Sequence, residues 1–491
     1  MSKSCILSVL TSLLIAMSSS APGQNVSWVN TQYHNIQYNP ELSNFQSCSD
    51  RIGNTFTTVI NQFKTAYGQD FYGDALLKKY NTSGSLVLSK LFPGRVNFDA
   101  LTTDEAGNLY ASGSFMDTLV VDSVNKLFNT GTGFNLNYFL IKLDKNGNFA
   151  WAKNINAIYG QYRTLDVIHV KDGSLFAGIY DFNNGTVYKY DLNGNQLMTI
   201  QQLNVRSVSS IITDNLGNII VSGSCGQGNI TFGNLVLYTP FPYNVYFAKY
   251  NSSGICQWGR FVEDITFQRA DLACDSDNNI YAAGDLFDST WFGNIRAIGR
   301  QWVYDFFVTK IDPSGEFLWV REVPNYSGSP TGDVRRGKTK SLAIDNNDRI
   351  YFTASLRGTV NWGNGFVSES NGGFDINLLI FDKQGTMLNE RSFGGLSNDR
   401  PDCISFDGNG NLYMSGNYAL SSTFDTITVS GTGYINSYIA KIPFGESHGT
   451  VLLSMIMQGF YNQYTEELIT NDTVRLYLRS PSAPFNKVDS A

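Results

Sequence analysis

Two short motifs alternate along this chain of 491 residues, and their repetition restricts the fold more than any other feature. The first motif is KYNTSG from Lys79, KLDKNG from Lys142, KYDLNG from Lys189, KYNSSG from Lys249 and KIDPSG from Lys310, with variants from Ile380 and Lys441. The second motif is DEAGNLYASG from Asp104, with copies from Asp50, Lys171, Asp214, Asp275, Asp345 and Asp407. Both recur at roughly 45 to 70 residues, a spacing typical of four-stranded propeller blades and not of helical solenoids.

Each motif has the chemistry of a hairpin turn. Asp or Asn at the first position bonds nearby backbone, and the later Gly takes a positive φ. The flanking segments are apolar or alternating, as in FLIKL before Asp144 and FAWAK after the turn. We therefore predict an all-β fold, a seven-bladed β-propeller of four-stranded blades over residues 24–445, plus a short partial β C-terminal segment over 446–491.

The count of outer strands predicts how the ring closes. No segment of the FAWAK type follows the last third strand, which begins at Ser437, but NVSWVNTQY from Asn25 has this pattern. We therefore predict that Trp28 and its neighbours pair antiparallel with residues 438–442, and that residues 45–50 form the inner strand of the first blade. Such closure leaves no exposed sheet edge at the seam.

Tryptophans recur in the outer strands, at Trp151, Trp258 and Trp319. We interpret them as packing residues between blades, although a sugar-stacking platform is the alternative. The Asp275, Asp277 and Asn279 spacing resembles a calcium loop, and Asp407, Asn409 and Asn411 repeat it. Neither loop has a downstream bidentate Glu, so ordinary turn chemistry is favoured, and no metal or cofactor is expected.

Composition places the chain outside several classes. Residues 1–23 read as a signal peptide, with Lys3 followed by an apolar run too short to span a bilayer. The net charge of −7, without basic blocks, excludes the footprint of a nucleic-acid binder. Five sparse cysteines after residue 24 indicate buried small hydrophobes and no disulfide framework. We expect a secreted or cell-surface monomer without a membrane span.

The units KLDKNGNFAWAK and DEAGNLYASGSF resemble the SBBP (seven-bladed beta-propeller) repeats of secreted bacterial proteins, over about residues 25–445. This resemblance implies an extracytoplasmic propeller and supplies no catalytic residues. The segment from Glu446 is similar to the C-terminal β-domain that precedes type IX secretion sorting modules, and we expect the chain to contain only part of it. Two strand-like runs are predicted there, at 451–460 and 473–479, with loose packing or disorder after about Ser480.

Catalytic motifs are not found. The histidines are His34, His169 and His448, and His169 on an inner strand is expected to be structural. We favour a non-catalytic binding or adhesion module for glycan or protein ligands; the alternative is a polysaccharide hydrolase or lyase using the loop face. Paired carboxylates with room for a sugar ring would favour the enzyme.

A basic residue enters the inner strand in six of the seven blades, near the loop-face mouth of the central channel. The candidate ligand-binding residues are Arg95, Arg163, Arg206, Arg269, Arg336 and Arg400, with Tyr159, Tyr162 and Tyr326 placed to stack on sugars. The acids Asp99, Asp166, Asp271 and Asp402 follow four of these arginines, so Arg–Asp ties between blades are the plainer interpretation. The alternative is a positive funnel for an anionic partner such as a uronate-containing glycan. On that alternative, replacing Arg163 and Arg269 with Ala should abolish binding.

Overall fold

The computed structural model describes residues 25–33, 45–66, 69–129, 136–155, 163–182, 184–300, 303–324, 332–431 and 435–444, together with four short strands after residue 460. The chain divides into two compact parts, residues 1–445 and 446–491. The described residues form antiparallel strands and no helix, in agreement with the all-β class expected from the sequence.

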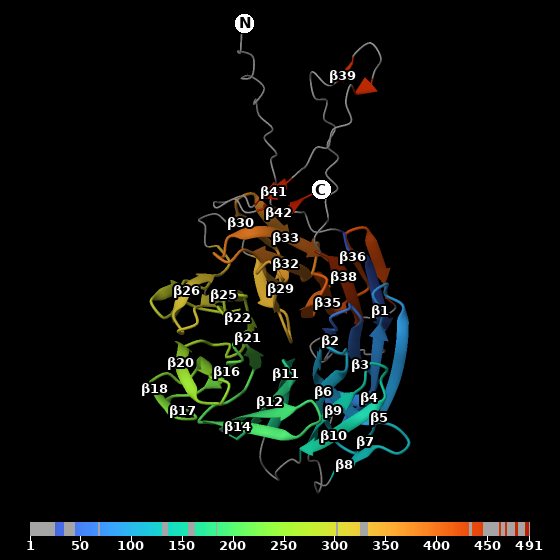
Figure 1. Cartoon of the computed structure of the whole chain (residues 1–491), viewed down its shortest axis with the longest axis vertical. Coiled ribbons are helices and arrows are strands. Elements are labelled where there is room, and N and C mark those ends of the chain that lie inside the picture. The colour runs from blue at the N-terminus through green and yellow to red at the C-terminus, as the bar shows by residue number, and fades with distance from the viewer. Residues whose placement is uncertain are drawn as a thin grey trace. The chain divides into compact units, whose positions relative to one another are not determined.

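Apart from hairpin arms, the described strands of the larger part fall into seven sets with four strand positions each, which we call repeats 1 to 7; in repeat 6 the first position is divided between two strands (Figure 1). Repeat 1 contains β2 (Gln46–Ser49), β3 (Thr55–Ala66), β4 (Gln69–Tyr80) and the start of β5 (Leu86–Thr103). Repeat 2 contains the rest of β5, β6 (Leu109–Phe115), β9 (Asn137–Leu143) and β10 (Phe149–Ile155). Repeat 3 contains β11 (Arg163–Lys171), β12 (Ser174–Asp181), β13 (Asn184–Asp191) and β14 (Gln196–Leu203). Strand β5 belongs to two repeats, because its first half pairs with β4 and its second half with β6.

The later repeats have the same order of strands. Repeat 4 contains β15 (Ser210–Thr213), β16 (Ile219–Cys225), β19 (Asn244–Tyr250) and β20 (Cys256–Glu263), and repeat 5 contains β21 (Ala270–Cys274), β22 (Ile280–Leu286), β25 (Asp305–Ile311) and β26 (Phe317–Arg321). Repeat 6 contains β27 (Asp333–Arg336) with β28 (Leu342–Ile344), β29 (Ile350–Arg357), β32 (Asp375–Phe381) and β33 (Met387–Phe393). Repeat 7 contains β34 (Arg400–Phe406), β35 (Asn411–Tyr418), β38 (Asn436–Pro443) and β1 (Trp28–Tyr33).

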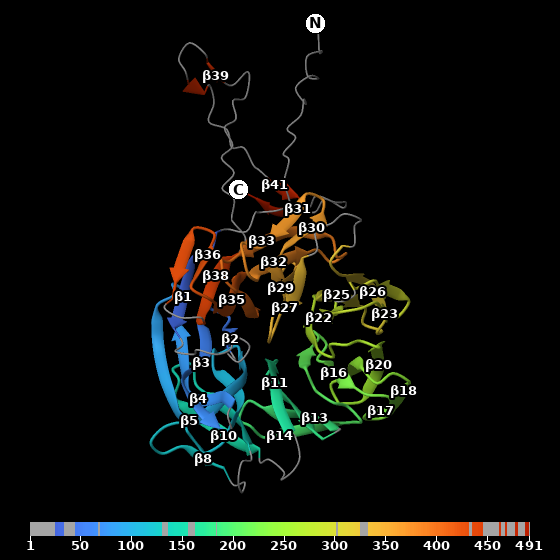
Figure 2. The same cartoon turned by 180° about the vertical axis from the view of Figure 1, so that it is seen from behind.

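The first strands of the repeats contact one another in a closed series. The order is β2, β5, β11, β15, β21, β28 and β34, and β34 contacts β2. Figures 1 and 2 show the repeats following one another around these strands. The result is a propeller-like all-β fold.

The apolar core lies between consecutive repeats. Each cluster of buried residues combines the sheets of two neighbours, as where Phe176 of repeat 3 packs with Tyr246 of repeat 4 and where Phe306 of repeat 5 packs with Phe352 of repeat 6. The alternation of apolar residues along the strands therefore serves contacts between sheets. All five cysteines in the described residues are free; Cys48, Cys225, Cys256 and Cys403 are buried and Cys274 is half-buried, which supports their interpretation as small hydrophobes.

Strand β1 completes repeat 7, as the sequence predicts. It pairs antiparallel with β38, with Trp28 opposite Lys441 and Thr31 opposite Tyr438. Strand β2 pairs with β3 and opens repeat 1, also as predicted. Because β1 covers the outer edge of β38, the backbone groups along that edge are paired.

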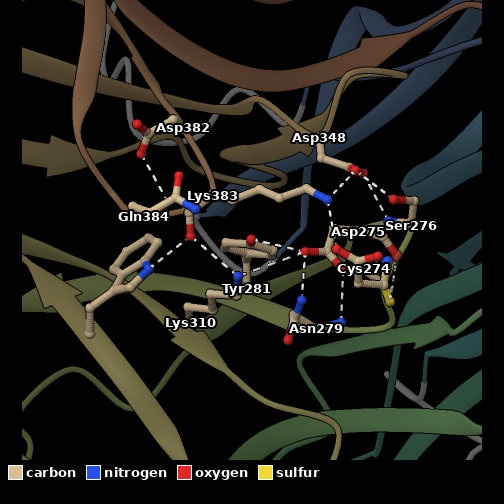
Figure 3. Close-up of polar contacts among 12 residues, drawn as sticks. Cys274, Asp275, Ser276, Asn279, Tyr281, Lys310, Asp348, Asp382, Lys383 and Gln384 are labelled. Atoms are coloured by element: carbon tan, nitrogen blue, oxygen red, sulfur yellow. Dashed lines mark hydrogen bonds and ion pairs between the residues drawn. The ribbon is translucent and has the colours of Figure 1, made fainter. Parts of the chain in front are cut away.

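The conserved spacing of Lys and Trp within the motifs has a structural cause. In four repeats the fourth-strand tryptophan donates from Nε1 to a turn carbonyl of the following repeat at 3.1 Å, and the third-strand lysine donates to the same oxygen. The pairs are Trp151 with Lys142 on Leu192, Trp258 with Lys249 on Pro313, Trp319 with Lys310 on Lys383, and Trp28 with Lys441 on Thr82. Figure 3 shows this contact at Lys383. The tryptophans therefore join repeats, which confirms their interpretation as packing residues.

The calcium-like spacing at Asp275 is explained by its turn. One carboxylate oxygen accepts the backbone N–H of Asp277 and Asn279, and the other accepts Asn279 Nδ2 and the Tyr281 hydroxyl, all between 2.8 and 3.0 Å. Asp407 accepts the same set from Asn409, Asn411 and Tyr413. These oxygens are occupied by the turn, as the sequence analysis favours.

Hairpin arms connect the second and third strands in five repeats. They are β7 (Thr118–Val120) with β8 (Lys126–Phe128), β17 (Gly228–Phe232) with β18 (Leu235–Thr239), β23 (Thr290–Phe292) with β24 (Ile295–Ala297), β30 (Thr359–Gly363) with β31 (Phe366–Glu369), and β36 (Ser421–Phe424) with β37 (Ile427–Ser430). An arm reaches back to the preceding repeat: β17 pairs with β14, and Thr423 forms a bridge with Gly394 after β33.

The smaller part contains β39 (Tyr461–Asn462) paired with β40 (Glu467–Leu468), and β41 (Tyr477–Arg479) paired with β42 (Lys487–Ser490). The predicted run at 473–479 coincides with β41 at its end, whereas the run at 451–460 lies outside the described residues. Strand β42 lies beyond Ser480, where the sequence analysis expected loose packing or disorder.

Candidate functional site

A central cavity of about 820 Å³ is enclosed by the first strands of all the repeats. Its wall includes His169, Lys340, Cys48 and Cys403. His169 Nε2 lies 3.1 Å from the Thr213 hydroxyl. Burial, followed by the charges of Lys340 and Lys171, lowers the pKa of His169 to about 3. A histidine that stays neutral and hydrogen-bonded fits the structural role expected for it.

Two carboxylates line this cavity where β5 and β11 lie side by side. Asn97 Nδ2 donates to Asp99 Oδ1, and Asp166 is the neighbouring acid on β11. Burial, and then the charge of Asp166, raises the pKa of Asp99 well above its usual value. Acid–base chemistry on a polysaccharide requires two acids, one of them protonated, and the raised pKa of Asp99 suits the protonated one.

A second cavity, of about 320 Å³, opens where repeats 5, 6 and 7 meet, and we call it the basic pocket. Its wall contains four cationic side chains and two carboxylates, which leaves an excess of two positive charges when all are ionised. The cationic residues are Arg335, Arg336, Lys338 and Arg400, and the acids are Asp285 and Asp402. Tyr304, Ser355 and Asn417 add further polar groups.

The basic pocket exists because the first strand of repeat 6 is split. Strand β27 ends at Arg336, and Gly337 donates its N–H to Thr353 O at 3.0 Å. The next residues leave repeat 6 and bond to repeat 7, where Thr339 N–H donates to Asp402 O at 2.8 Å and Lys340 bridges Cys403 in parallel. This crossing carries Lys338 toward Asp402 and brings cations from two repeats together.

Aromatic rings hold two of the arginines. The Arg335 guanidinium lies 3.7 Å from the centroid of the Tyr304 ring and 4.9 Å from that of Phe374. Arg400 lies 5.2 Å from the Phe374 centroid. A guanidinium held over an aromatic ring keeps the N–H groups at its edge available for bidentate recognition of a carboxylate.

Arg336 has a different role, because it is buried between two acids of repeat 5. Its Nη1 lies 3.3 Å from Asp271 Oδ2 and its Nε lies 3.1 Å from Asp285 Oδ2. This is an Arg–Asp tie between repeats, the plainer interpretation of the sequence pattern. The acids belong to the preceding repeat, however, and not to the segment that follows the arginine.

Burial also weakens the negative charge of the pocket. It raises the pKa of Asp402 to about 7, although the charges of Lys338 and Arg400 and a hydrogen bond from Asn417 oppose the rise. Burial likewise raises the pKa of Asp285, against the opposing charge of Arg336. Near neutral pH the two carboxylates of the wall therefore offset less of its positive charge, although Asp333 and Asp271 outside the wall pair with Arg335 and Arg336.

The structure brings together only some of the predicted residues. Arg336 and Arg400 line the basic pocket, and Arg269 lines the neighbouring central cavity. Arg95 instead bonds to Asp117 at 2.8 Å, and Arg206 donates to Pro242 O at 2.8 Å. Arg163 pairs through its backbone with Asp181 in β12, and its side chain lies outside the described region. Tyr159, Tyr162 and Tyr326 also lie outside the described residues.

Several pocket residues escape the sequence pattern. Arg335, Asp285 and Tyr304 were not proposed, since they occupy no repeated position. The available signal is the density of basic residues at 335–340, where RRGKTK holds four cations in six positions.

Within the described residues, His, Cys, Asp and Glu form no cluster of three that is placed to hold a metal ion. No helix suited to crossing a membrane was found in the part of the chain that was searched.

No protein-family model and no curated protein matches the chain. Among solved structures, a chain of a mitotic checkpoint complex is 10% identical with a TM-score of 0.44, over 89% of this chain and 98% of its own. A protein of unknown function from Dyadobacter fermentans is 12% identical with a TM-score of 0.39, over 86% of this chain and 100% of its own. A putative 6-phosphogluconolactonase from Bacteroides fragilis is 12% identical with a TM-score of 0.38, over 71% of this chain and 83% of its own. Similarity this low assigns neither a family nor a function.

Proposed function

We propose that the chain is a secreted seven-bladed β-propeller that binds an acidic glycan in its basic pocket and catalyses no reaction. The blade count rests on the alternating motifs and on the closed series of first strands. Secretion rests on the apolar segment after Lys3, and residues 1–23 are the proposed signal peptide. Residues 446–491 are the proposed C-terminal β-domain.

The observation that carries this proposal is the concentration of cations in the basic pocket. Four cationic side chains from the two repeats 6 and 7 face one cavity in a protein whose net charge is −7. If the arginines were distributed evenly over the repeats, contacts between blades would be enough to explain them. A local positive cavity with ring-stacked guanidinium groups suits the carboxylates of uronate residues, which are planar and repeat along a chain.

Calorimetric titration with oligogalacturonate tests the proposal, with a neutral dextran oligomer as the reference ligand. We expect binding to oligogalacturonate alone, weakening as salt increases. The double variant Arg335→Gln with Lys338→Gln should lower the affinity by at least tenfold. Arg95→Gln is the matched control, because Arg95 lies outside the pocket beside Asp117. Equal losses in both variants, or binding to dextran, would contradict the assignment.

A polysaccharide hydrolase or lyase is the second candidate. It is favoured by Asp99 and Asp166 in the central cavity, where burial, and then the charge of Asp166, raises the pKa of Asp99. Release of new reducing or unsaturated ends from oligogalacturonate, lost in both Asp99→Asn and Asp166→Asn, would establish this activity. Binding without any product after prolonged incubation would support the non-catalytic module.

A further inference from the structure

The first residue of the third strand occupies an equivalent buried position in several repeats. It is Asn137 in β9, Asn244 in β19 and Asn436 in β38, but Asp305 in β25 and Asp375 in β32. A neutral amide needs no counter-charge there, whereas a carboxylate does. The two aspartates therefore mark repeats in which an ionised side chain would need a positive charge beside it.

Repeat 5 supplies that charge from within the chain. Arg300 Nε lies 3.6 Å from Asp305 Oδ2, and the Asp305 side chain is fully buried. The other oxygen of Asp305 accepts the N–H groups of Phe306 at 2.7 Å and Val323 at 3.0 Å. Arg300 precedes Asp305 by five residues, and the residue five before Asp375 is Ser370. Repeat 6 thus lacks the cation of repeat 5.

Repeat 6 places a second acid beside Asp375. Asp375 Oδ2 accepts Asn371 N–H at 2.8 Å, and Asp399 Oδ2 accepts Gly395 N–H at 2.9 Å. A Cβ at the adjacent Gly394 would overlap the Asp375 carboxylate, so both acids lie against this pair of glycines. Asp375 is 3% exposed and Asp399 is 0% exposed.

Among the described residues, three buried oxygens make no hydrogen bond of normal length and angle, although the Ser422 hydroxyl and the N–H groups of Ala419 and Gly395 lie close enough to these carboxylates to lower their pKa values. The three oxygens are Asp375 Oδ1, Asp399 Oδ1 and the Ser422 hydroxyl, which faces Asp399 from the arm β36–β37. Backbone N–H groups hold the Oδ2 atom of each acid and so orient the Oδ1 atoms. This is how ligating carboxylates are commonly supported by groups behind them. Buried oxygens without a hydrogen bond of normal geometry, beside two adjacent acids, are suited to a cation.

We propose that Asp375, Asp399 and Ser422 form a calcium site that fastens the arm of repeat 7 to repeat 6. Two carboxylates balance a divalent charge, and hard oxygen donors are the ligands that calcium prefers, with backbone carbonyls or water completing the shell. The bridge between Gly394 and Thr423 already joins the two segments beside the site. Calcium would therefore connect three segments: the start of β32, the connection before β34 and the arm.

The test is calcium titration of the chelator-treated full chain, by calorimetry and thermal unfolding in parallel. We expect a saturable site and a midpoint that rises by several degrees with calcium. In Asp399→Asn and Asp375→Asn the calcium response should disappear while the protein remains folded. Asp305→Asn is the matched control, since it removes the equivalent acid in repeat 5 and should leave the response unchanged. Asp122→Asn, in the turn between β7 and β8, is a second control should Asp305→Asn fail to fold.

An unaltered calcium response in Asp375→Asn and Asp399→Asn would overturn the site. So would the absence of any calcium response in the wild type. If the wild type shows no calcium response and its stability falls as the pH rises through 8, the two acids Asp375 and Asp399 share a proton and do not bind calcium.

Discussion

Replacing Lys249 with Met tests a buried ion pair within repeat 4, whose lysine also donates to Pro313 O of repeat 5. Lys249 Nζ lies 3.0 Å from Asp214 Oδ2, and the two side chains are 4% and 0% exposed. Removing one member of a buried ion pair costs about 3–5 kcal/mol, because the other charge stays buried without its partner. Asp214 keeps hydrogen bonds from Leu216 and Asn218, so we expect a loss near the lower limit, about 3 kcal/mol.

Guanidinium chloride unfolding followed by tryptophan fluorescence measures this loss. The control is Arg51→Met, which breaks an exposed pair with Glu105 whose side chains are 67% and 72% exposed. That change should leave the unfolding midpoint nearly unaltered, since exposed pairs are screened by water and salt. Equal midpoints for the two variants would refute the argument from burial.

The acid dependence of Lys249→Met gives an independent result. Burial alone would raise the pKa of Asp214, but hydrogen bonds from Asn218 and Lys249 lower it below the usual value. The folded protein then binds fewer protons than the unfolded chain near pH 4. The stabilisation by this pair is present above that pH and is lost as the pH falls through the folded-state pKa. The variant should therefore lose less stability on acidification than the wild type.

Two further predictions concern the seam and the pocket. Deleting residues 24–33 removes β1 and exposes the edge of β38, so this variant should aggregate in size-exclusion chromatography. Deleting the separate compact part 446–491 should not cause aggregation. A monomeric 24–33 deletion variant would contradict the closure of the ring by β1. Because burial raises the pKa of Asp402 to about 7, Asp402 should bind a proton as the pH falls from 8 to 6, and the affinity of the wild type for oligogalacturonate should rise several-fold. Asp402→Asn should not show this rise, and the same pH dependence in both proteins would show that Asp402 is not its cause.

The repeated elements were predictable because each copy solves the same local problem. Asp, Gly and the following apolar strand recur wherever a hairpin turns, and the copy of the outer-strand pattern around Trp28 predicted its pairing with β38. The carbonyl contact of Trp258 and Lys249 was not predicted in detail, because the acceptor belongs to the next repeat. Packing between tryptophan and a neighbouring blade was nevertheless expected from the position of the residue.

The basic pocket could be predicted only in part, since it depends on departures from the repeat. The sequence pattern treated Arg95, Arg206 and Arg400 as equivalent, but neighbouring loops give each a different environment. Arg95 meets Asp117 and Arg206 meets the carbonyl of Pro242, whereas Arg400 joins the pocket beside Phe374. The split between β27 and β28, which carries Lys338 across to repeat 7, has no local signal beyond Gly337 and the run of basic residues.

A crystal structure of the protein with bound oligogalacturonate tests the central claim most directly. The account predicts a uronate carboxylate in the basic pocket, within hydrogen-bond distance of Arg335 or Lys338, with Arg335 still stacked on Tyr304. The ligand should leave Arg336 bonded to Asp271 and Asp285, since that arginine joins repeats. A ligand bound across Asp99 and Asp166 in the central cavity, with the basic pocket empty, would contradict the claim.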